Sequence, residues 1–332
     1  MGVLGWTGFG AIVEERLNRP LTSESDSHVV PWTTGKPAAR QLAMMAYDAR
    51  DRYVVLFGGV DPYGNVLGDT WTYHAGAWTK LAVSPHPPAR YGGSMTYDAA
   101  DGYLLLFGGC GSYTCPLGDT WAFAGGIWTH LHPHPHPSPR MQEMMAYDAR
   151  DGYVVFFGGL NSTSYTTLSD TWTFYHGKWT QLFLTTSPSD RSYGMMAFDG
   201  RDFCVVLFGG TNQTGFIFGD TWTYSGGAWT TFVPASRPSA RYGAMMSEDT
   251  NDSYVVMFGG ITNRGDSSST WTYAAGQWTQ RSPTSHPSAR DSGMMDDDGG
   301  DGYLVLFGGS TVYGSTAYRD TWSYTAGVFT KQ

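Results

Sequence analysis

One short sequence pattern occurs six times in the chain, at spacings of 49 to 51 residues. In each copy an apolar run ends in Phe-Gly-Gly, and a Thr-Trp pair follows. The Phe-Gly-Gly copies begin at Phe57, Phe107, Phe157, Phe208, Phe258 and Phe307, and the following tryptophans are Trp71, Trp121, Trp172, Trp222, Trp271 and Trp322. A unit of this length cannot bury its own apolar face, so it has to stack on its neighbours. The period therefore predicts a stacked repeat architecture.

Each copy divides into four strand-like segments, described here for the second copy. Residues 91–97 form a small, apolar first strand, and residues 103–107 form a continuous apolar run typical of a strand covered on both faces. Residues 119–123 alternate in character, and residues 127–129 follow a Gly-Gly turn as a fourth strand. No copy has a helical period of useful length. We therefore expect four-stranded antiparallel blades.

The sequence resembles the Kelch repeat, particularly its bacterial and archaeal form, in the run Pro87-Pro88-Ala89-Arg90-Tyr91-Gly92, the Tyr-to-Phe-Gly-Gly strand, the Asp-Thr-Trp and the later Trp. The resemblance covers roughly residues 36–332 and implies an all-β, six-bladed β-propeller whose first strands line a central channel. The blades are expected at about 40–81, 90–131, 140–182, 191–232, 241–281 and 290–332. Kelch propellers mostly bind proteins, but the family includes a copper oxidase, sialic acid epimerases and iron-dependent specifier proteins. The fold alone therefore does not choose a function.

Residues 1–35 do not repeat and are predicted to be an N-terminal extension. Trp32-Thr33, followed by Pro37 and Arg40, resembles the end of a fourth strand that leads into a blade. We expect an extra edge strand around Trp32; the alternative is the remnant of a truncated seventh blade. The first residues lack the basic region and long apolar run of a signal peptide, so an exported protein would begin upstream of this chain.

The composition bears on the partners and the compartment of the protein. The net charge is −9 and only 15% of the residues are charged, which argues against a nucleic acid partner. No run approaches the 18 apolar residues of a membrane helix, so membrane insertion is not expected. Asn-x-Ser/Thr sequons at Asn161, Asn212 and Asn251 favour an extracellular glycoprotein weakly.

The chain has three cysteines, two of which bear on the compartment in which the protein works. Cys110 and Cys115 bracket a short loop between the second and third strands of blade two, and we predict a local disulfide there, which implies an oxidising compartment. The alternative is a pair of loop thiols. Cys204 takes the slot of a strand tyrosine and is interpreted as a buried core residue.

Catalytic and metal-binding constellations are not evident in the sequence, so no cofactor, no metal and no enzymatic activity is predicted. The first strands offer Ala, Gly, Ser and paired Met, which we interpret as deformable packing rather than copper ligands. Asp296-Asp297-Asp298 is interpreted as a solvated turn, with a calcium site as the alternative. The tract from His130 to His136 is interpreted as an elaborated Pro/His linker, with His130 and His132 as ligands of Zn²⁺ or Cu²⁺ in the alternative.

An arginine precedes each first strand in the pattern Pro-x-x-Arg, giving Arg40, Arg90, Arg140, Arg191, Arg241 and Arg290. Chain direction places these arginines on one face, together with the blade linkers and the variable loops that follow Phe-Gly-Gly. Variation confined to one rim of a rigid scaffold is typical of a binding surface. In Kelch adaptors that capture acidic peptides, arginines at the matching positions contact the ligand's carboxylates, and the resemblance implies the same role here. Aromatic contacts are expected from the loop residues Tyr63, Tyr113, Phe216 and Tyr313.

The alternative for this ring is a framework role. Each arginine would pair with the aspartate that opens the third strand of its blade, namely Asp69, Asp119, Asp170, Asp220 or Asp320. Two inter-strand steps, about 9–10 Å, separate the first and third strands, which a long Arg only partly spans. Blade five has Ser269 at that position, so Arg241 is the best candidate for a ligand-facing group.

Taken together, these patterns predict a non-enzymatic binding or surface protein, extracellular or at the cell surface, that binds a protein or an acidic glycan through the arginine ring and variable loops. The alternatives are a carbohydrate-active enzyme of the sugar-acid epimerase kind and a self-associating subunit of a surface assembly.

Overall fold

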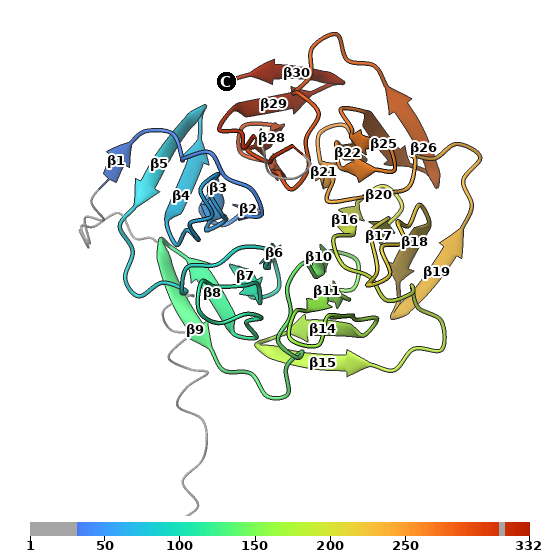
Figure 1. The fold of residues 1–332 in the computed structure, drawn as a ribbon, viewed down its shortest axis with the longest axis horizontal. Helices are drawn as coiled ribbons and strands as arrows, with labels where there is room; N and C mark the ends of the chain where they lie inside the picture. Colours follow the sequence, from blue (N-terminus) through green and yellow to red (C-terminus); the bar gives the residue numbers. More distant parts are fainter. Residues whose placement is uncertain (1–31, 312–315) are drawn as a thin grey trace, which may run out of the picture.

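The computed structural model describes residues 32–311 and 316–332. In this part of the chain, β-sheets are arranged as six blades around a central axis, and the first and last blades lie side by side (Figure 1). Each blade is antiparallel, and its four main strands run from the axis to the outer edge in chain order. The predicted six-bladed β-propeller is confirmed.

Equivalent strands occupy equivalent positions in every blade. The innermost strands are β2 (Met44–Asp48), β6 (Ser94–Asp98), β10 (Met144–Asp148), β16 (Met195–Asp199), β21 (Met245–Asp249) and β27 (Met294–Asp298). The second strands are β3 (Tyr53–Phe57), β7 (Tyr103–Phe107), β11 (Tyr153–Phe157), β17 (Cys204–Phe208), β22 (Tyr254–Phe258) and β28 (Tyr303–Phe307). The third strands are β4 (Thr70–His74), β8 (Thr120–Ala124), β14 (Thr171–Tyr175), β18 (Thr221–Ser225), β25 (Thr270–Ala274) and β29 (Thr321–Thr325). The outer strands are β5 (Ala77–Leu81), β9 (Ile127–Leu131), β15 (Lys178–Leu182), β19 (Ala228–Phe232), β26 (Gln277–Arg281) and β30 (Val328–Lys331).

Six shorter strands complete the described fold. They are β1 (Trp32–Thr34), β12 (Leu160–Asn161), β13 (Thr166–Thr167), β20 (Arg241–Tyr242), β23 (Ile261–Thr262) and β24 (Gly265–Asp266). Strand β1 pairs antiparallel with β5, with Trp32 opposite Leu81, so blade one carries a fifth strand on its outer edge. Of the predicted N-terminal extension, residues 1–35, the part before Trp32 lies outside the described residues.

The hydrophobic core consists of six clusters, each between two neighbouring blades. The second strands supply its centre, because their apolar runs are covered on both faces. Between blades one and two, Phe57 packs against Trp128 with ring centroids 5.1 Å apart, and the Trp128 indole N–H donates to Thr70 Oγ1 at 3.0 Å. Large rings thus fill the wedge between blades, and each indole that has a threonine opposite it also makes a hydrogen bond across the interface.

The Phe-Gly-Gly motif lets neighbouring blades approach closely. A Cβ added to Gly58 would lie 2.4 Å from the backbone oxygen of Arg90 in the next blade, and Gly59 has a φ of +99°. The Gly59 N–H donates to that same Arg90 oxygen at 2.8 Å. Glycine is required at both positions because any side chain would collide with the neighbour or strain the backbone.

The propeller has two faces. The linker face carries the blade linkers and the loops between second and third strands, for example residues 82–93 and 58–69 in blades one and two. The turn face carries the turns between first and second and between third and fourth strands, for example residues 49–52 and 75–76. On the turn face, Asp51 of blade one accepts a hydrogen bond from the Gly125 N–H of blade two at 2.6 Å. The repeated turns therefore connect blades as well as strands.

Candidate functional site

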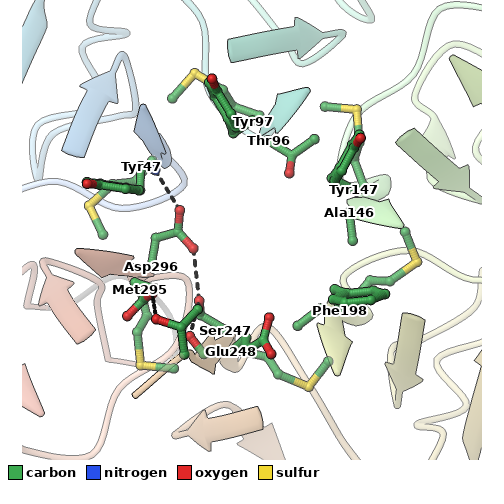
Figure 2. Close-up of a pocket in the computed structure, with 18 of the residues that line it drawn as sticks. Tyr47, Thr96, Tyr97, Ala146, Tyr147, Phe198, Ser247, Glu248, Met295 and Asp296 are labelled. Atoms are coloured by element: carbon green, nitrogen blue, oxygen red, sulfur yellow. Dashed lines mark hydrogen bonds between the residues drawn. The ribbon is translucent and has the colours of Figure 1, made fainter. Parts of the chain in front are cut away.

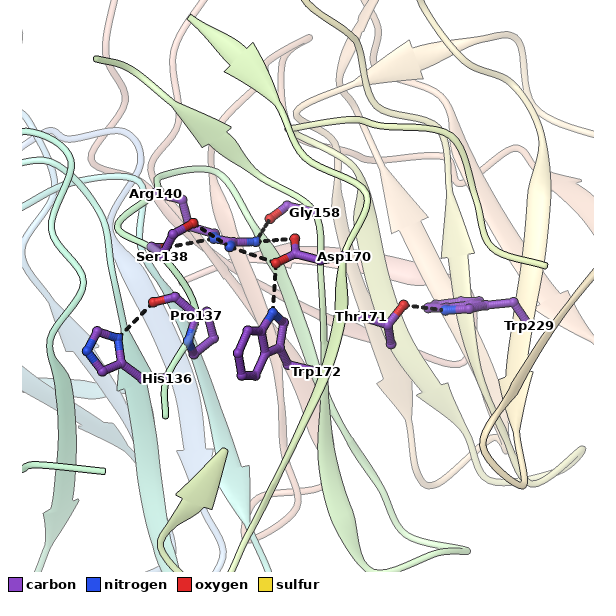
Figure 3. A network of polar contacts seen from close by, with 9 residues as sticks. All are labelled: His136, Pro137, Ser138, Arg140, Gly158, Asp170, Thr171, Trp172 and Trp229. Atoms are coloured by element: carbon purple, nitrogen blue, oxygen red, sulfur yellow. Dashed lines mark hydrogen bonds and ion pairs between the residues drawn. The ribbon is translucent and has the colours of Figure 1, made fainter. Parts of the chain in front are cut away.

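The six arginines of the Pro-x-x-Arg pattern form a buried network on the linker face. In blade three, the Arg140 guanidinium donates to both carboxylate oxygens of Asp170, at 2.5 and 2.9 Å, and to the Gly158 carbonyl at 3.0 Å (Figure 3). Its Nε–H donates to the Ser138 carbonyl at 2.9 Å. Asp170 also accepts the Trp172 indole N–H at 2.7 Å. Every donor of this arginine therefore has an acceptor in its own blade.

The same ion pair forms in four further blades, as Arg40–Asp69, Arg90–Asp119, Arg191–Asp220 and Arg290–Asp320, each at 2.7 Å. Burial alone would raise the pKa of these aspartates, but the hydrogen bonds and charge of the arginines outweigh it and lower the pKa. The arginine side chains are 0–2% exposed. They are therefore framework groups, in place of the ligand contacts that the resemblance implied. The reach is sufficient because each arginine lies beyond the end of the second strand and passes over its glycine carbonyl.

The arginine backbone ties each blade to the one before it. The Arg90 N–H donates to the Leu67 carbonyl of blade one at 3.0 Å, while the Arg90 carbonyl accepts from Gly59 of blade one. The Arg90 side chain meanwhile binds Asp119 of blade two. One residue per repeat thus holds two blades in register, which explains why this pattern recurs in every blade.

Blade five is the exception, because Ser269 takes the place of the aspartate. Arg241 is still buried, at 2% exposure, and its guanidinium donates to the Gly259 carbonyl at 2.8 Å and to Ser269 Oγ at 2.9 Å. It does not project into solvent as the prediction of a ligand-facing group required.

Unlike the buried arginines, the predicted loop aromatics of the linker face that the structure describes are exposed. Tyr63, Tyr113 and Phe216 are exposed at loop tips, and Tyr313 lies outside the described residues. At the axis of this face, a cavity of about 460 Å³ is lined by residues that include Tyr193, Tyr242 and Asp291. None of the six arginines lines this cavity, so the predicted arginine and aromatic residues do not converge on one site.

The opposite mouth of the channel, on the turn face, is a cup of about 330 Å³ formed by the ends of the six innermost strands. We call it the axial cup, and its lining includes the methionines Met45, Met95, Met145, Met196, Met246 and Met295. Aromatic rings stand around one part of its wall, namely Tyr47, Tyr97, Tyr147 and Phe198 from blades one to four (Figure 2). Acidic residues stand around the rest, namely Glu248 of blade five and Asp296 and Asp297 of blade six. One part of the wall is therefore aromatic and the other part is acidic.

Hydrogen bonds fix the acidic part of the axial cup. Asp296 accepts from the Tyr47 backbone N–H at 2.7 Å and from Ser247 Oγ at 2.8 Å, so it links blades five, six and one (Figure 2). Glu248 Oε1 accepts from the Gly200 N–H at 2.7 Å, and Asp297 Oδ2 accepts from Thr250 Oγ1 at 2.5 Å. These contacts leave Glu248 Oε2 without a partner among the described residues, whereas the second oxygen of Asp297, Oδ1, is buried beneath the surface of the cup.

The acids of the axial cup also repel one another. Burial, followed by the charges of Asp199, Asp249 and Asp296, raises the pKa of Glu248 to about 7. Burial, followed by the charges of Asp296, Asp249 and Glu248, raises the pKa of Asp297 to about 7 against its hydrogen bond from Thr250. Burial likewise raises the pKa of Asp296. A positive charge placed among these groups would relieve this repulsion and favour their ionised forms.

The interpretation of Asp296-Asp297-Asp298 as a solvated turn is wrong. Asp297 and Asp298 are 8% and 0% exposed, because the innermost strand β27 continues through them to the axis. An alignment of the repeats by register carries the missing signal. One column reads Tyr, Tyr, Tyr, Phe, Glu, Asp from blade one to blade six, at Tyr47, Tyr97, Tyr147, Phe198, Glu248 and Asp297.

Two histidines of the tract contact neighbouring groups of the propeller, and His130, His132 and His134 are exposed. His136 Nδ1 lies 2.8 Å from the Pro137 carbonyl (Figure 3), and His86 and His286 make the same contact with the prolines that follow them. His130 stacks on Trp121 at 4.5 Å, with the ring of His132 4.1 Å away. Among the described residues, no group of three or more His, Cys, Asp or Glu is placed to hold a metal ion.

The predicted disulfide between Cys110 and Cys115 is confirmed. It closes the loop between the second and third strands of blade two on the linker face. Cys204 is a free, buried thiol in β17, and burial raises its pKa to about 12.

Thiol titration of the native, unreduced protein is expected to find no rapidly reacting group and, after unfolding in denaturant, one thiol per chain. That thiol is Cys204, which burial protects in the folded state. Ellman's reagent with and without prior reduction measures the difference, and a Cys204→Ser variant should give zero. Three thiols without reduction would contradict the disulfide.

Comparisons with known proteins agree with this architecture. A family model described as the KLHDC2/KLHL20/DRC7 Kelch-repeats domain matches residues 73–232. A solved structure described as "Structure of YjhT" superposes with a TM-score of 0.67 at 16% sequence identity, covering 92% of this chain and 99% of that one. No curated protein matches the chain in sequence. Within the described residues, no helix has the length and apolarity needed to cross a membrane. The chain therefore contains Kelch-type repeats, matched over residues 73–232, and has the fold of a six-bladed β-propeller.

Proposed function

We propose that this protein is a non-enzymatic binding protein that holds a cationic group, an alkylammonium or alkylguanidinium, in the axial cup. A Kelch-repeat propeller supports a binding or scaffold role, and Kelch propellers mediate protein binding. The cationic group that we propose for the axial cup is therefore the side chain of a lysine or arginine of a partner protein. The observation that carries the proposal is the division of the cup into an aromatic part and an acidic part.

Each part of the axial cup suits a different part of such a ligand. Ring faces attract cations, and aromatic walls also cover the alkyl stem of a lysine or arginine. Glu248 offers a carboxylate oxygen to the charged end, and Asp297 adds negative charge beside it. Hydrogen bonds between ionised groups are stronger than neutral ones. The volume of about 330 Å³ falls in the range of small-ligand pockets.

The location of the acids favours binding over the alternative of sugar-acid chemistry. An epimerase-like site would need arginines to hold a carboxylate beside an acid–base pair. The acids lie on the turn face, whereas the arginines lie on the linker face and are engaged by aspartates. The two groups therefore do not meet at one substrate.

The compartment is a second part of the proposal. We infer that the protein works outside the cytoplasm, because the Cys110–Cys115 disulfide is typical of oxidising compartments. The sequons at Asn161 and Asn212 support the same setting, because both lie in loops of the linker face.

Isothermal titration with three matched probes tests the axial cup. N-acetyl-lysinamide and N-acetyl-argininamide are expected to bind, whereas N-acetyl-norleucinamide, which keeps the alkyl chain without the charge, should not. The double variant Glu248→Gln with Asp297→Asn should weaken lysinamide binding by about 10-fold or more, because charged hydrogen bonds contribute about 1.5–3 kcal/mol. Binding should strengthen as the pH rises from about 6 to 8, because Glu248 and Asp297 lose protons near pH 7.

Asp61→Asn is the matched control, because it removes one negative charge from a linker-face loop. It should bind the probes as the unmodified protein does. Equal binding of norleucinamide, or unchanged lysinamide affinity in the double variant with an unchanged melting temperature, would refute the cationic ligand.

A further inference from the structure

Blade five differs from the other blades at two positions around its arginine. Ser269 stands where the other five blades have the paired aspartate. Ser267 stands where they have a large apolar residue, namely Leu67, Leu117, Leu168, Phe218 and Tyr318. In blades four and six, Phe218 and Tyr318 lie against the guanidinium at 4.0 Å. Blade five has therefore lost both the carboxylate and the apolar cover.

The donors of the arginine motif remain in place in blade five. In the other blades, one aspartate accepts from the arginine and from the indole N–H of the tryptophan two residues after it. Asp119, for example, accepts from Arg90 and from Trp121, each at 2.7 Å. The equivalent Trp271 is 8% exposed, and its buried indole N–H has no acceptor among the described residues. Trp271 keeps the strand register of its counterparts, so its N–H faces the position of the missing carboxylate.

The side chains that accept from the Arg241 guanidinium are serine hydroxyls rather than a carboxylate. Its NH2 group donates to Ser239 Oγ at 3.0 Å, and its NH1 group donates to Ser269 Oγ at 2.9 Å. Ser267 Oγ lies 2.8 Å from Ser269 Oγ. All acceptors that the structure shows for this guanidinium are neutral, and burial lowers the pKa of Arg241 to about 10. A buried cation without a counter-charge is costly, so an anion is favoured beside it.

We propose that blade five binds a small monovalent anion, a halide or a formate-sized carboxylate, between the Arg241 guanidinium, the Trp271 indole N–H and the hydroxyls of Ser267 and Ser269. The anion takes the part that an aspartate carboxylate plays in the other five blades. The anion is expected to be no larger than the single carboxylate group that it replaces.

Solvent reaches this position from the linker face. The paired aspartates of the other blades are 16–34% exposed, although their arginines are buried. Serine at position 267 covers less of it than leucine, phenylalanine or tyrosine does. A small ion therefore has a path to the guanidinium, whereas a folded partner could not reach it.

Bromide is the direct probe of this anion site. Crystals soaked in sodium bromide should show an anomalous peak beside Arg241 and Trp271, and Ser269→Asp should remove it because the new carboxylate occupies the position. Ser285→Asp, which adds the same charge on an exposed linker, should keep the peak. Absence of bromide at Arg241 in the unmodified protein would overturn the proposal, as would a peak that persists in Ser269→Asp.

Thermal unfolding gives a second measurement in solution. At an anion concentration ten times its Kd, the ratio of folded to unfolded protein should rise roughly 11-fold. The melting temperature of the unmodified protein should therefore rise with sodium chloride or formate more than that of Ser269→Asp, and Ser285→Asp should respond as the unmodified protein does. General salt effects cancel in this comparison, so identical responses of all three proteins would count against the site.

Discussion

Replacement of Asp119 by alanine is expected to lower the free energy of unfolding by about 3–5 kcal/mol, because it leaves a buried charge without its partner. Arg90 has no exposed side-chain surface and donates to both oxygens of Asp119 at 2.7 Å. The Trp121 indole N–H would lose its acceptor at the same time. Urea unfolding, followed by far-ultraviolet circular dichroism, measures the change.

Blade five supplies the matched comparison for this prediction. Asp119→Ser copies Ser269, but blade two has Pro88 and Leu117 where blade five has the hydroxyls of Ser239 and Ser267. We therefore expect Asp119→Ser to be nearly as damaging as Asp119→Ala. Ser269→Asp should instead stabilise the protein. A loss below about 1 kcal/mol for Asp119→Ala, the level of an exposed ion pair, would mean that the network is not the framework described here.

Replacement of Glu143 by glutamine is expected to stabilise the protein at high pH and to have little effect at low pH. The Glu143 side chain is 7% exposed, and its carboxylate oxygens have no hydrogen-bond partner among the described residues. Burial raises its pKa to about 8, above the ordinary value of 4.5. Between these values the folded state binds more protons than the unfolded state, so the free energy of unfolding falls as the pH rises.

The size of the effect follows from the shift. Each pKa unit corresponds to about 1.4 kcal/mol, so the difference between Glu143→Gln and the unmodified protein should grow from near zero at pH 4 to about 5 kcal/mol above pH 8. Urea unfolding of both proteins from pH 4 to 9 measures it. Glu143→Ala copies Ala43 and Ala244 of other blades and should show the same pH dependence, displaced by lost packing. Parallel curves for all three proteins would show that Glu143 is ionised in the folded state.

The sequence by itself determined the repeat, the number of blades and most of the framework. A period of 49 to 51 residues, unbroken apolar second strands and Gly-Gly turns are local properties, and each recurs six times. Such patterns predict structure well because neighbouring residues in one strand or turn must satisfy them. The Cys110–Cys115 disulfide is equally local, since its loop spans five positions.

The sequence was less informative about the arginines. Both a ligand-binding role and an aspartate-paired framework role were open from the sequence, and the choice between them depended on distance. Arg90 and Asp119 are 29 residues apart, and they meet only because the arginine lies beyond the strand end and crosses a glycine carbonyl. That geometry depends on how the linker from the previous blade enters, which is a tertiary feature.

Only the tertiary structure decided where the axial cup lies. Tyr47 and Asp296 are 249 residues apart in the chain, yet the Tyr47 N–H donates to the Asp296 carboxylate because blades one and six are neighbours in the closed ring. Within one repeat, Glu248 or Asp297 is a single polar residue near a turn, with nothing to distinguish it from a solvated side chain. Ring closure brings the six equivalent strand ends to one axis, and substitutions scattered through the chain thereby become one site.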